Sequence, residues 1–355
     1  MTDLPLLLVI DDEPDRLEQL AASLRTVLHK VAEIVEWQPK ANEDPLARFE
    51  EETSKNVRLV ATDQDLTRSG TGLLGSSIAS WAQDKYLPVC NFSRQPQRRL
   101  PRERNFFEIR VPSEATDDAR ARYIGRIFRG FETLRSHVES ANAGAPLARL
   151  LAGAMGLPSL VDDVTPFVAS VGLANAGLIQ GRQSVEGLPT GVERIDLVSF
   201  MLGHTLLNAV LEFPGPILGR EALAAYCATG PGDADRLAKV FKGAEYVGPF
   251  AEPEAYFVKG MVDRKIDELA SSIETDATDD QYNKAAVASV LDQLHPHACS
   301  RCGGERGGFW CPFVERAVCN RTDCSVQATA WIPRGASLCR VEKDYFDEWS
   351  PLLGG

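Results

Sequence analysis

The stretch LPLLLVIDDEPDRLEQLAASLRTVL, residues 4–28, decides the fold of the first part of the chain. It opens with an apolar run, residues 6–10, of the length expected for a buried strand. Acidic residues follow, and apolar side chains then recur at the spacing of an amphipathic helix, at Leu17, Leu20, Leu24, Val27 and Leu28. A buried strand that leads directly into a helix predicts the start of a βαβ unit.

The same alternation of strand and helix continues to about residue 140. Further strands are predicted over residues 32–39, 57–65, 87–93 and 105–111, and further helices over residues 45–55, 72–83 and 117–138. Apolar strands that alternate with helices are typical of a parallel sheet covered on both faces. We therefore expect residues 1–140 to form an α/β domain with a flavodoxin-like, doubly wound parallel sheet.

Acidic residues stand at the ends of two predicted strands. Asp11 and Asp12 follow the first strand, and Asp63 lies at the end of the strand predicted over residues 57–65. In open α/β sheets the functional site lies beyond the carboxyl ends of the strands. Carboxylates gathered there repel one another, and a hard cation such as Mg²⁺ relieves that repulsion by taking oxygen ligands. We expect a weak Mg²⁺ site, with a solvated acidic loop as the alternative.

Two segments, LLLVIDDEPDRLEQL and LVATDQDL…GTGLLG, resemble the opening and the phosphoacceptor segment of response-regulator receiver domains, which act in bacterial signal transduction and phosphorelays. The resemblance covers about the first 140 residues. It implies a receiver fold in which Asp11 and Asp12 bind Mg²⁺, Asp63 accepts the phosphoryl group and also contacts the metal, and the backbone carbonyl of Asp65 completes the metal site.

The resemblance also implies three further pocket residues. Ser93 falls at the switch serine or threonine position, Phe107 at the switch aromatic position, and Arg110 where the family has a lysine. Arg110 is bulkier than lysine and forked, and Val111 is an alternative occupant of that position because the expected proline comes one residue late. We therefore expect an atypical receiver that transfers phosphoryl groups poorly.

A second departure concerns the fourth helix of the family. Only RQPQRRLPRER, residues 94–104, separates Ser93 from the next strand, and this segment contains two prolines. It predicts a basic loop in place of a helix, with Arg94, Arg98, Arg99, Arg102 and Arg104. The loop is either a solvated connection or a docking patch for an acidic protein, RNA or DNA.

The middle region, residues 145–293, is predicted to be mainly helical. It contains 11 Lys and Arg against 19 Asp and Glu over residues 141–290, which argues against binding to a phosphate backbone. Residues 220–241 fit a helix-turn-helix, but core packing is the preferred interpretation, and His204 is expected to be a core histidine. No Walker loop, nucleophile elbow or zinc-protease motif is present, so an enzymatic role is disfavoured.

The C-terminal region, residues 294–345, is predicted to be a small zinc-ribbon-like module. Cys299 and Cys302 form a C-x₂-C pair followed by two glycines, and Cys319 and Cys324 form a second pair. Four thiolates leave no open coordination position, so the expected zinc is structural. Two other cysteines, Cys311 and Cys339, are possible substitutes in the second pair, or ligands of a second ion with His295 or His297.

Together these patterns favour a signalling or scaffold protein that binds protein partners. A bacterial stress or defence system is one context in which such a protein would act. Nucleic acid is expected only at the loop of residues 94–104 or at the zinc module. No apolar run is long enough for a membrane span, and the N-terminal segment lacks a basic region and runs directly into acidic residues, so we expect a cytoplasmic protein. A phosphorylation-controlled regulator with a DNA-binding output and an enzyme with its active site in the middle region remain alternatives.

Overall fold

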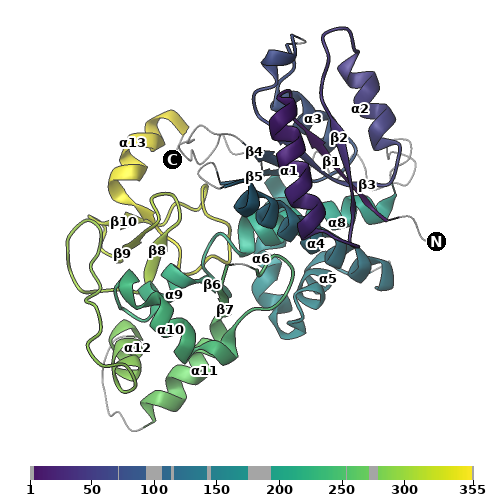
Figure 1. Cartoon of the computed structure of the whole chain (residues 1–355). Coiled ribbons are helices and arrows are strands. Elements are labelled where there is room, and N and C mark those ends of the chain that lie inside the picture. The colour runs from purple at the N-terminus through teal and green to yellow at the C-terminus, as the bar shows by residue number, and fades with distance from the viewer. Residues whose placement is uncertain are drawn as a thin grey trace. The chain divides into compact units, whose positions relative to one another are not determined.

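A computed structural model of the chain (Figure 1) describes residues 4–70, 72–92, 106–112, 116–141, 145–174, 193–252, 254–271 and 279–353. These residues group into two compact units. The first unit takes in the described residues up to 145 and those from 193 to 204, and the second contains residues 146–174 and those from 205 onward. Ser93 and the arginines of the predicted loop, Arg94, Arg98, Arg99, Arg102 and Arg104, lie outside the described residues.

The first unit is built on a five-stranded parallel sheet, which confirms the predicted α/β class. The strands lie in the order β2-β1-β3-β4-β5 and are β1 (Leu6–Ile10), β2 (Glu33–Trp37), β3 (Val57–Asp63), β4 (Val89–Phe92) and β5 (Glu108–Arg110). The helices are α1 (Pro14–Val27), α2 (Pro45–Thr53), α3 (Gly75–Asp84), α4 (Asp117–Ser140) and α8 (Arg194–Thr205), and a 3₁₀ turn, η1, spans Thr67–Ser69.

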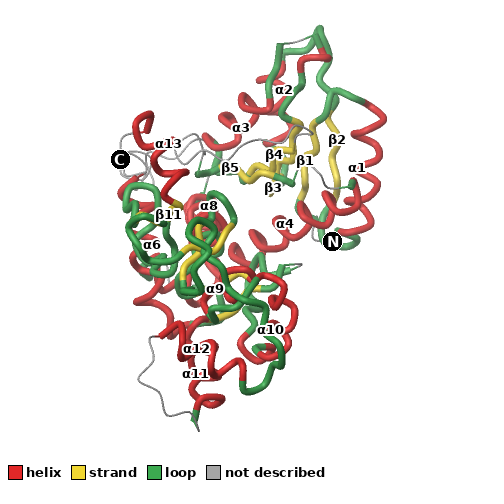
Figure 2. Tube along the Cα trace, turned by 90° about the vertical axis from the view of Figure 1, so that its left-hand side faces the viewer, coloured by secondary structure: helices red, strands yellow, loops and turns green. Residues whose placement is uncertain are grey.

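Helices cover both faces of this sheet. Leu8 and Ile10 of β1 point to a core with Phe49 of α2 and Ile78 of α3, whereas α1 and α4 pack together on the opposite face (Figure 2). Gly125 of α4 permits this close approach, because a Cβ at that position would lie 2.5 Å from a Val27 methyl group. The apolar strands therefore read as continuous hydrophobic runs because both of their faces are buried.

Helix α8 belongs to the first unit, although the sequence pattern joins it to the helical middle region. Its Phe200 ring stacks on Phe107 at 5.0 Å between centroids and meets Tyr86 at 5.8 Å. The start of the helix is fixed by Asp196, which forms ion pairs with Arg135 of α4 and Arg58 of β3.

His204 lies near the end of α8 and is fully buried. Aromatic rings surround it, those of Phe106, Phe107, Phe131 and Phe200. Burial lowers the pKa of His204 to about 3, so the imidazole is neutral at physiological pH. This environment is the one expected of a core histidine.

The second unit combines helices with three antiparallel strand pairs. Its helices are α5 (Leu147–Ala154), α6 (Val161–Ala174), α9 (Arg220–Tyr226), α10 (Ala234–Val240), α11 (Lys259–Ala270), α12 (Asp279–Ala288) and α13 (Lys343–Leu353). Short helical turns are η2 (Pro158–Leu160), the π-helical η4 (Leu206–Val210), η5 (Pro231–Asp233) and η6 (Lys242–Ala244). The strand pairs are β6 (Ile217–Gly219) with β7 (Tyr256–Val258), β8 (Phe309–Cys311) with β9 (Arg316–Val318), and β10 (Ser325–Val326) with β11 (Val341–Glu342).

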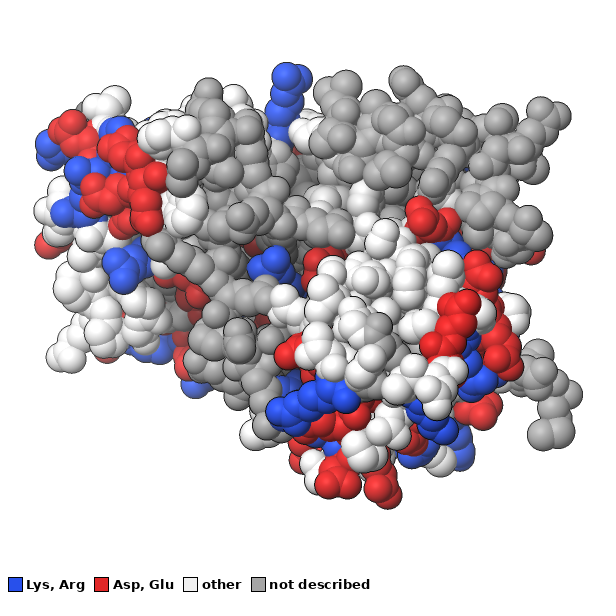
Figure 3. All heavy atoms as spheres, turned by 90° about the horizontal axis from the view of Figure 1, so that it is seen from above, with Lys and Arg blue, Asp and Glu red and all other residues white. Residues whose placement is uncertain are grey.

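Acidic and basic side chains are intermixed on the face of the molecule drawn in Figure 3, and its described residues present no extended basic patch there. Among the described helices, none is both long enough and apolar enough to cross a membrane.

The packing of α8 generates a prediction about Gly203. A Cβ at this position would lie 2.1 Å from a ring carbon of Phe131, so Gly203→Ala should destabilise the protein by about 1–3 kcal/mol through overpacking. The matched control is Gly260→Ala in α11, where a Cβ meets nothing within 4 Å and should be neutral or slightly stabilising. Urea unfolding measures both, and equal stability of the two variants would contradict the described packing of α8.

Candidate functional site

The candidate site lies at the carboxyl ends of β1 and β3, which are neighbours in the sheet. Asp11 and Asp12 directly follow β1, and Asp63 is the last residue of β3. One carboxylate oxygen from each of the three residues lies within 4.8 Å of the other two. This convergence follows from the parallel pairing, because Ile10 is paired with Thr62 and the next residues along both strands emerge at the same edge.

A glycine allows the start of α3 to lie close to the backbone of Asp63. The first residue of α3, Gly75, donates its N–H to the carbonyl of Gln64 at 3.0 Å. A Cβ at Gly75 would lie only 2.4 Å from the Asp63 carbonyl oxygen, so only glycine lets α3 begin this close to the end of β3.

Two of the three carboxylates are buried, and that of Asp63 is partly buried. Asp11 is 2% exposed and Asp12 8% exposed. Burial raises the pKa of Asp11 to about 6; repulsion from Asp63 and Asp12 adds to this, while the Glu13 N–H and Arg16 oppose it. Burial likewise raises the pKa of Asp63, against the backbone N–H groups of Asp65 and Gln64. The site therefore holds a proton more tightly than a solvated carboxylate does, and above that range the ionised carboxylates favour a bound cation.

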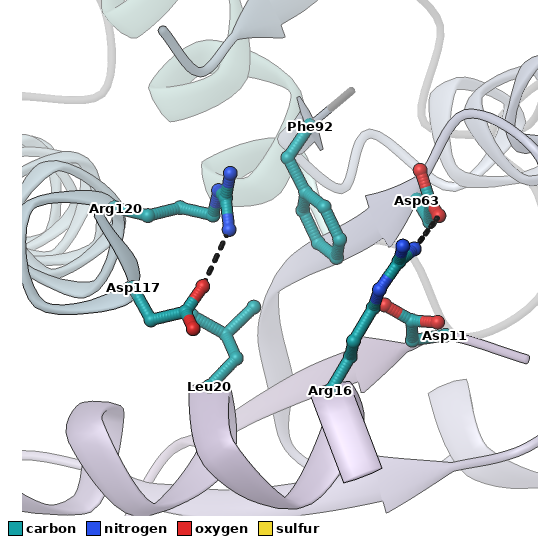
Figure 4. A pocket seen from close by; sticks show the side chains of 7 residues that line it. All are labelled: Asp11, Arg16, Leu20, Asp63, Phe92, Asp117 and Arg120. Carbon is teal, nitrogen blue, oxygen red and sulfur yellow. Dashed lines mark hydrogen bonds and ion pairs between the residues drawn. The ribbon is translucent and has the colours of Figure 1, made fainter. Parts of the chain in front are cut away.

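Arg16 of α1 supplies part of the missing positive charge. Its Nη1 lies 3.9 Å from Oδ2 of Asp63 (Figure 4), and its Nε forms an ion pair of 2.6 Å with Glu13. Glu13 is also paired with Arg68. One guanidinium beside three carboxylates leaves an excess of negative charge, so room for a divalent cation remains in the electrostatic balance.

A small pocket extends from the acidic cluster. It is lined by Asp11, Arg16, Leu20, Asp63, Phe92, Asp117 and Arg120 (Figure 4). Arg120 lies in the first turn of α4, which Thr116 caps by accepting the N–H of Ala119. The guanidinium of Arg120 donates to Asp117 at 2.6 Å and stands 5.8 Å from the centre of the Phe92 ring.

Two other residues of the predicted pocket, Phe107 and Arg110, are among the described residues. Phe107 is buried against Phe200 and His204, and neither Phe107 nor Arg110 is among the described residues that line the pocket. Val111, the alternative to Arg110, is buried and donates its N–H to Asn91, and it also stays outside that lining. The position of Ser93 lies outside the described residues.

The carboxylate of Asp65 is not part of the acidic cluster of Asp11, Asp12 and Asp63. It accepts the backbone N–H of Thr67 at 3.1 Å and the Thr67 hydroxyl at 2.6 Å, and the hydroxyl lowers the pKa of Asp65. The side chain is thus bonded to Thr67, the first residue of η1, and a metal contact through the backbone carbonyl of Asp65 stays a prediction.

Arg16 and Arg120 were not selected from the sequence as pocket residues. A signal for them exists, because α1 and α4 each begin at the carboxyl edge of the sheet, where a basic residue in the first helical turn lies near the strand ends. The resemblance points to one position only, the one at which the family has a lysine. It therefore gives no indication of arginines that come from the first turns of helices.

The second candidate site is a cluster of four cysteines, Cys299, Cys302, Cys319 and Cys324, whose sulfur atoms lie within 4.8 Å of one another. They lie close enough together to hold a metal ion. Three of the four are buried, and Cys302 is exposed. The Sγ atoms of Cys302 and Cys319, which come from different pairs, are 3.9 Å apart.

Backbone amides point at the sulfur atoms. Gly304 donates its N–H to Cys302 at 3.4 Å, and the Cys319 N–H donates to Cys299 at 3.4 Å. Gly303 adopts a left-handed conformation with φ of +65°, which a glycine reaches without strain. Although burial opposes the change, backbone N–H groups lower the pKa of Cys299 to about 7. Cys299 is thus prepared to be a thiolate, the form that binds a metal, whereas burial raises the pKa of Cys319 and Cys324.

The remaining candidate ligands of this region lie in other environments. Cys311 accepts the N–H of Glu342 at 3.3 Å, and burial raises the pKa of Cys339. His295 bonds to Asp233 at 2.9 Å, and His297 is buried. Within the part of the chain that the structure describes, these four residues form no group of three or more potential metal ligands.

Comparison with known proteins adds no relative: no protein-family model matches the chain, and none of the curated proteins matches it.

The raised pKa of Asp11 generates a prediction about pH. The folded state holds the Asp11 proton more tightly than the unfolded state, so its stabilising contribution is present below pH 4 and is lost as the pH rises through 6. Without divalent cations, Asp11→Asn should therefore raise the free energy of unfolding by about 1–3 kcal/mol at pH 7.5 and by little at pH 4. Urea unfolding in a chelator tests this, with Asp15→Asn, an exposed residue of α1, as the control. A gain that does not depend on pH would contradict the assigned burial effect.

Proposed function

We propose that the protein is a signalling or scaffold protein whose first unit is a receiver-like domain with a Mg²⁺-binding acidic pocket, and whose cysteine cluster holds a structural zinc ion. Both elements serve the binding of protein partners. The observation that carries the proposal is the convergence of Asp11, Asp12 and Asp63 at the edge of a parallel sheet.

The strand order supports the receiver-like interpretation. The sheet order β2-β1-β3-β4-β5 is that of flavodoxin-like folds, whose ligand site lies at the switch point between β1 and β3. The acidic cluster lies at this point. Its residues are also those that the resemblance to receiver domains assigns to metal binding and phosphorylation, so topology and residue chemistry agree.

The donor set fits Mg²⁺. Carboxylate oxygens are the ligands of hard cations, and Mg²⁺ keeps several of its waters, so three protein carboxylates at an open edge suffice. Asp11, Asp12 and Asp63 would hold the ion, which would neutralise the acids and polarise a bound oxyanion. Arg16 already lies beside Asp63 and competes with the ion for that charge, so binding is weak.

The cysteine cluster fits Zn²⁺. Two pairs of cysteines approach one another, and N–H groups from Gly304 and Cys319 aid the negative charge on sulfur. Cys299, Cys302, Cys319 and Cys324 would complete a tetrahedral shell, with no position left for substrate. The ion would tie the loop before β8 to the loop after β9, a folding role in a segment with short strands.

The Mg²⁺ site is tested by ligand-induced stabilisation. Because an ion that binds only the folded state raises its stability, MgCl₂ should raise the thermal midpoint of the full chain at pH 7.5 in a concentration-dependent way. Asp63→Asn should abolish the shift, and the exposed control Asp15→Asn should keep it. A wild-type midpoint insensitive to Mg²⁺ up to high concentration would reject the proposed pocket function.

The zinc site is tested by metal analysis. The purified chain should contain about one Zn²⁺, and Cys302→Ser should lose it and loosen residues 294–353 while the first unit remains folded. Cys339→Ala, outside the four-cysteine cluster, should retain the metal. Metal-free protein with freely reactive thiols, or loss of zinc on removal of Cys339 alone, would refute the assigned ligand set.

A further inference from the structure

Cys302 is the exposed member of the four-cysteine cluster. It lies in a turn, residues 301–303, that is exposed throughout. The other three sulfur ligands, Cys299, Cys319 and Cys324, are at most 2% exposed. Small oxidants in solution reach an exposed thiolate and are kept from a buried one. The cluster therefore has one sulfur atom that is open to attack.

A second sulfur atom lies close to the exposed one. The Sγ atoms of Cys302 and Cys319 are 3.9 Å apart. Four sulfur atoms at about 2.3 Å from a tetrahedral zinc ion stand roughly 3.8 Å from one another, so this spacing suits the metal. In a disulfide the two sulfur atoms are about 2.05 Å apart. A movement of about 2 Å would thus join the pair.

The backbone leaves Cys302 free to make that movement and holds Cys319 in place. Gly303 follows Cys302, and a Cβ at Gly303 would meet nothing within 4 Å, so the turn has open space around it. Cys319 is held on both sides. Its N–H donates to the sulfur of Cys299 at 3.4 Å, and its carbonyl accepts the hydroxyl of Ser325 at 2.6 Å.

We propose that Cys302 is a site of oxidation by peroxide and that Cys319 resolves the oxidised sulfur into a disulfide, with release of the zinc ion. The inference rests on the proposed structural zinc site and adds a redox-dependent regulation to it. Oxidation removes two of the four ligands at once. The two thiolates that remain, those of Cys299 and Cys324, are too few for the four-coordinate shell of a structural zinc ion.

Hydrogen peroxide supplies the oxidising equivalents in two steps. The Cys302 sulfur forms a bond to one peroxide oxygen, the O–O bond breaks, and hydroxide leaves with its electron pair. The Cys319 thiolate then forms the S–S bond, the S–O bond breaks, and a second hydroxide leaves. The two sulfur atoms together lose two electrons, which reduce the peroxide, and two protons from solvent convert the hydroxides to water.

Loss of the ion would affect the elements that follow Cys324. The carbonyl of Cys324 accepts the N–H of Lys343, the first residue of α13, at 2.9 Å. The next residue, Ser325, begins β10, a strand of two residues in a two-stranded sheet with β11. A strand pair of this size is at best marginally stable by itself. Oxidation should therefore loosen β10, β11 and the start of α13.

The experiment treats the purified full-length protein with hydrogen peroxide and compares the wild type with Cys302→His and Cys339→Ala. Histidine is a zinc ligand, so Cys302→His should keep a site of three cysteines and one histidine, and the exposed turn has room for the ring. Cys339→Ala removes a buried thiol outside the cluster and is the matched control.

Four quantities are measured. They are the zinc content before treatment, the rate of zinc release with a chromogenic chelator, the position of any disulfide by peptide mass after alkylation, and the rate of hydrogen exchange in β10, β11 and α13. Recovery is followed after addition of a dithiol reductant and Zn²⁺, because thiol–disulfide exchange reverses a disulfide but not a higher oxide of sulfur.

Peroxide should release the zinc of the wild type, form a disulfide between Cys302 and Cys319 and speed hydrogen exchange in β10 and β11. The reductant with Zn²⁺ should reverse all three changes. Cys302→His should release zinc roughly tenfold more slowly or less, because its remaining ligand thiols are buried. Cys339→Ala should respond as the wild type does.

Other results would overturn the inference. If the purified wild type contains no zinc, the proposed function fails first, and the inference fails with it. If zinc is present and peroxide neither releases it nor forms a disulfide, the inference is wrong and the structural zinc site stands. A disulfide from Cys302 to Cys299 or Cys324 would reject Cys319 as the resolving thiol.

The variant gives an independent test of the point of attack. Equal rates of zinc release from the wild type and from zinc-loaded Cys302→His would show that the exposed sulfur is not attacked first. If Cys302→His takes up no zinc, the position of the disulfide in the wild type decides alone.

Discussion

Mutual repulsion among three carboxylates, two of them buried and one partly buried, is the constraint on which the first unit depends. The parallel pairing of β1 and β3 brings Asp11, Asp12 and Asp63 to one edge, and burial of the apolar strands on both faces outweighs the cost of holding them there. The repulsion is only partly relieved by Arg16, so the site keeps a demand for positive charge. This demand follows from the topology and persists whether or not a phosphoryl group is ever transferred.

The sequence predicted this part of the fold well because its signals are local. Apolar runs ending in acids, and helices with apolar spacing, specify a parallel α/β sheet without knowledge of distant contacts. The place of α8 could not be predicted, since it depends on pairs far apart in the chain, such as Phe107 with Phe200 and Arg135 with Asp196. Its apolar periodicity says that one face is buried, and nothing in that periodicity says against which domain.

The same contrast separates the two candidate sites. The cysteine pairs can be recognised from their short spacing in the sequence. The β8–β9 hairpin brings the Sγ atoms of Cys302 and Cys319 to 3.9 Å from one another. Which of the six C-terminal cysteines group together is a tertiary property: Cys311 is held by the N–H of Glu342. In the acidic pocket, the aspartates could be predicted because they stand at the ends of predicted strands. Arg120 could not, because it belongs to a helix more than fifty residues after Asp63.

The position of Arg120 also bears on which elements can bring positive charge to this edge of the sheet. In a parallel sheet every strand end and every following helix start points to the same edge, so a cation required there can come from a strand or from a first helical turn. Arg110, at the end of β5, does not line the pocket, and Arg120, in the first turn of α4, does. The constraint is therefore on charge at a point in space. The loss of the expected basic residue at one sequence position therefore does not show that the pocket lacks a cation.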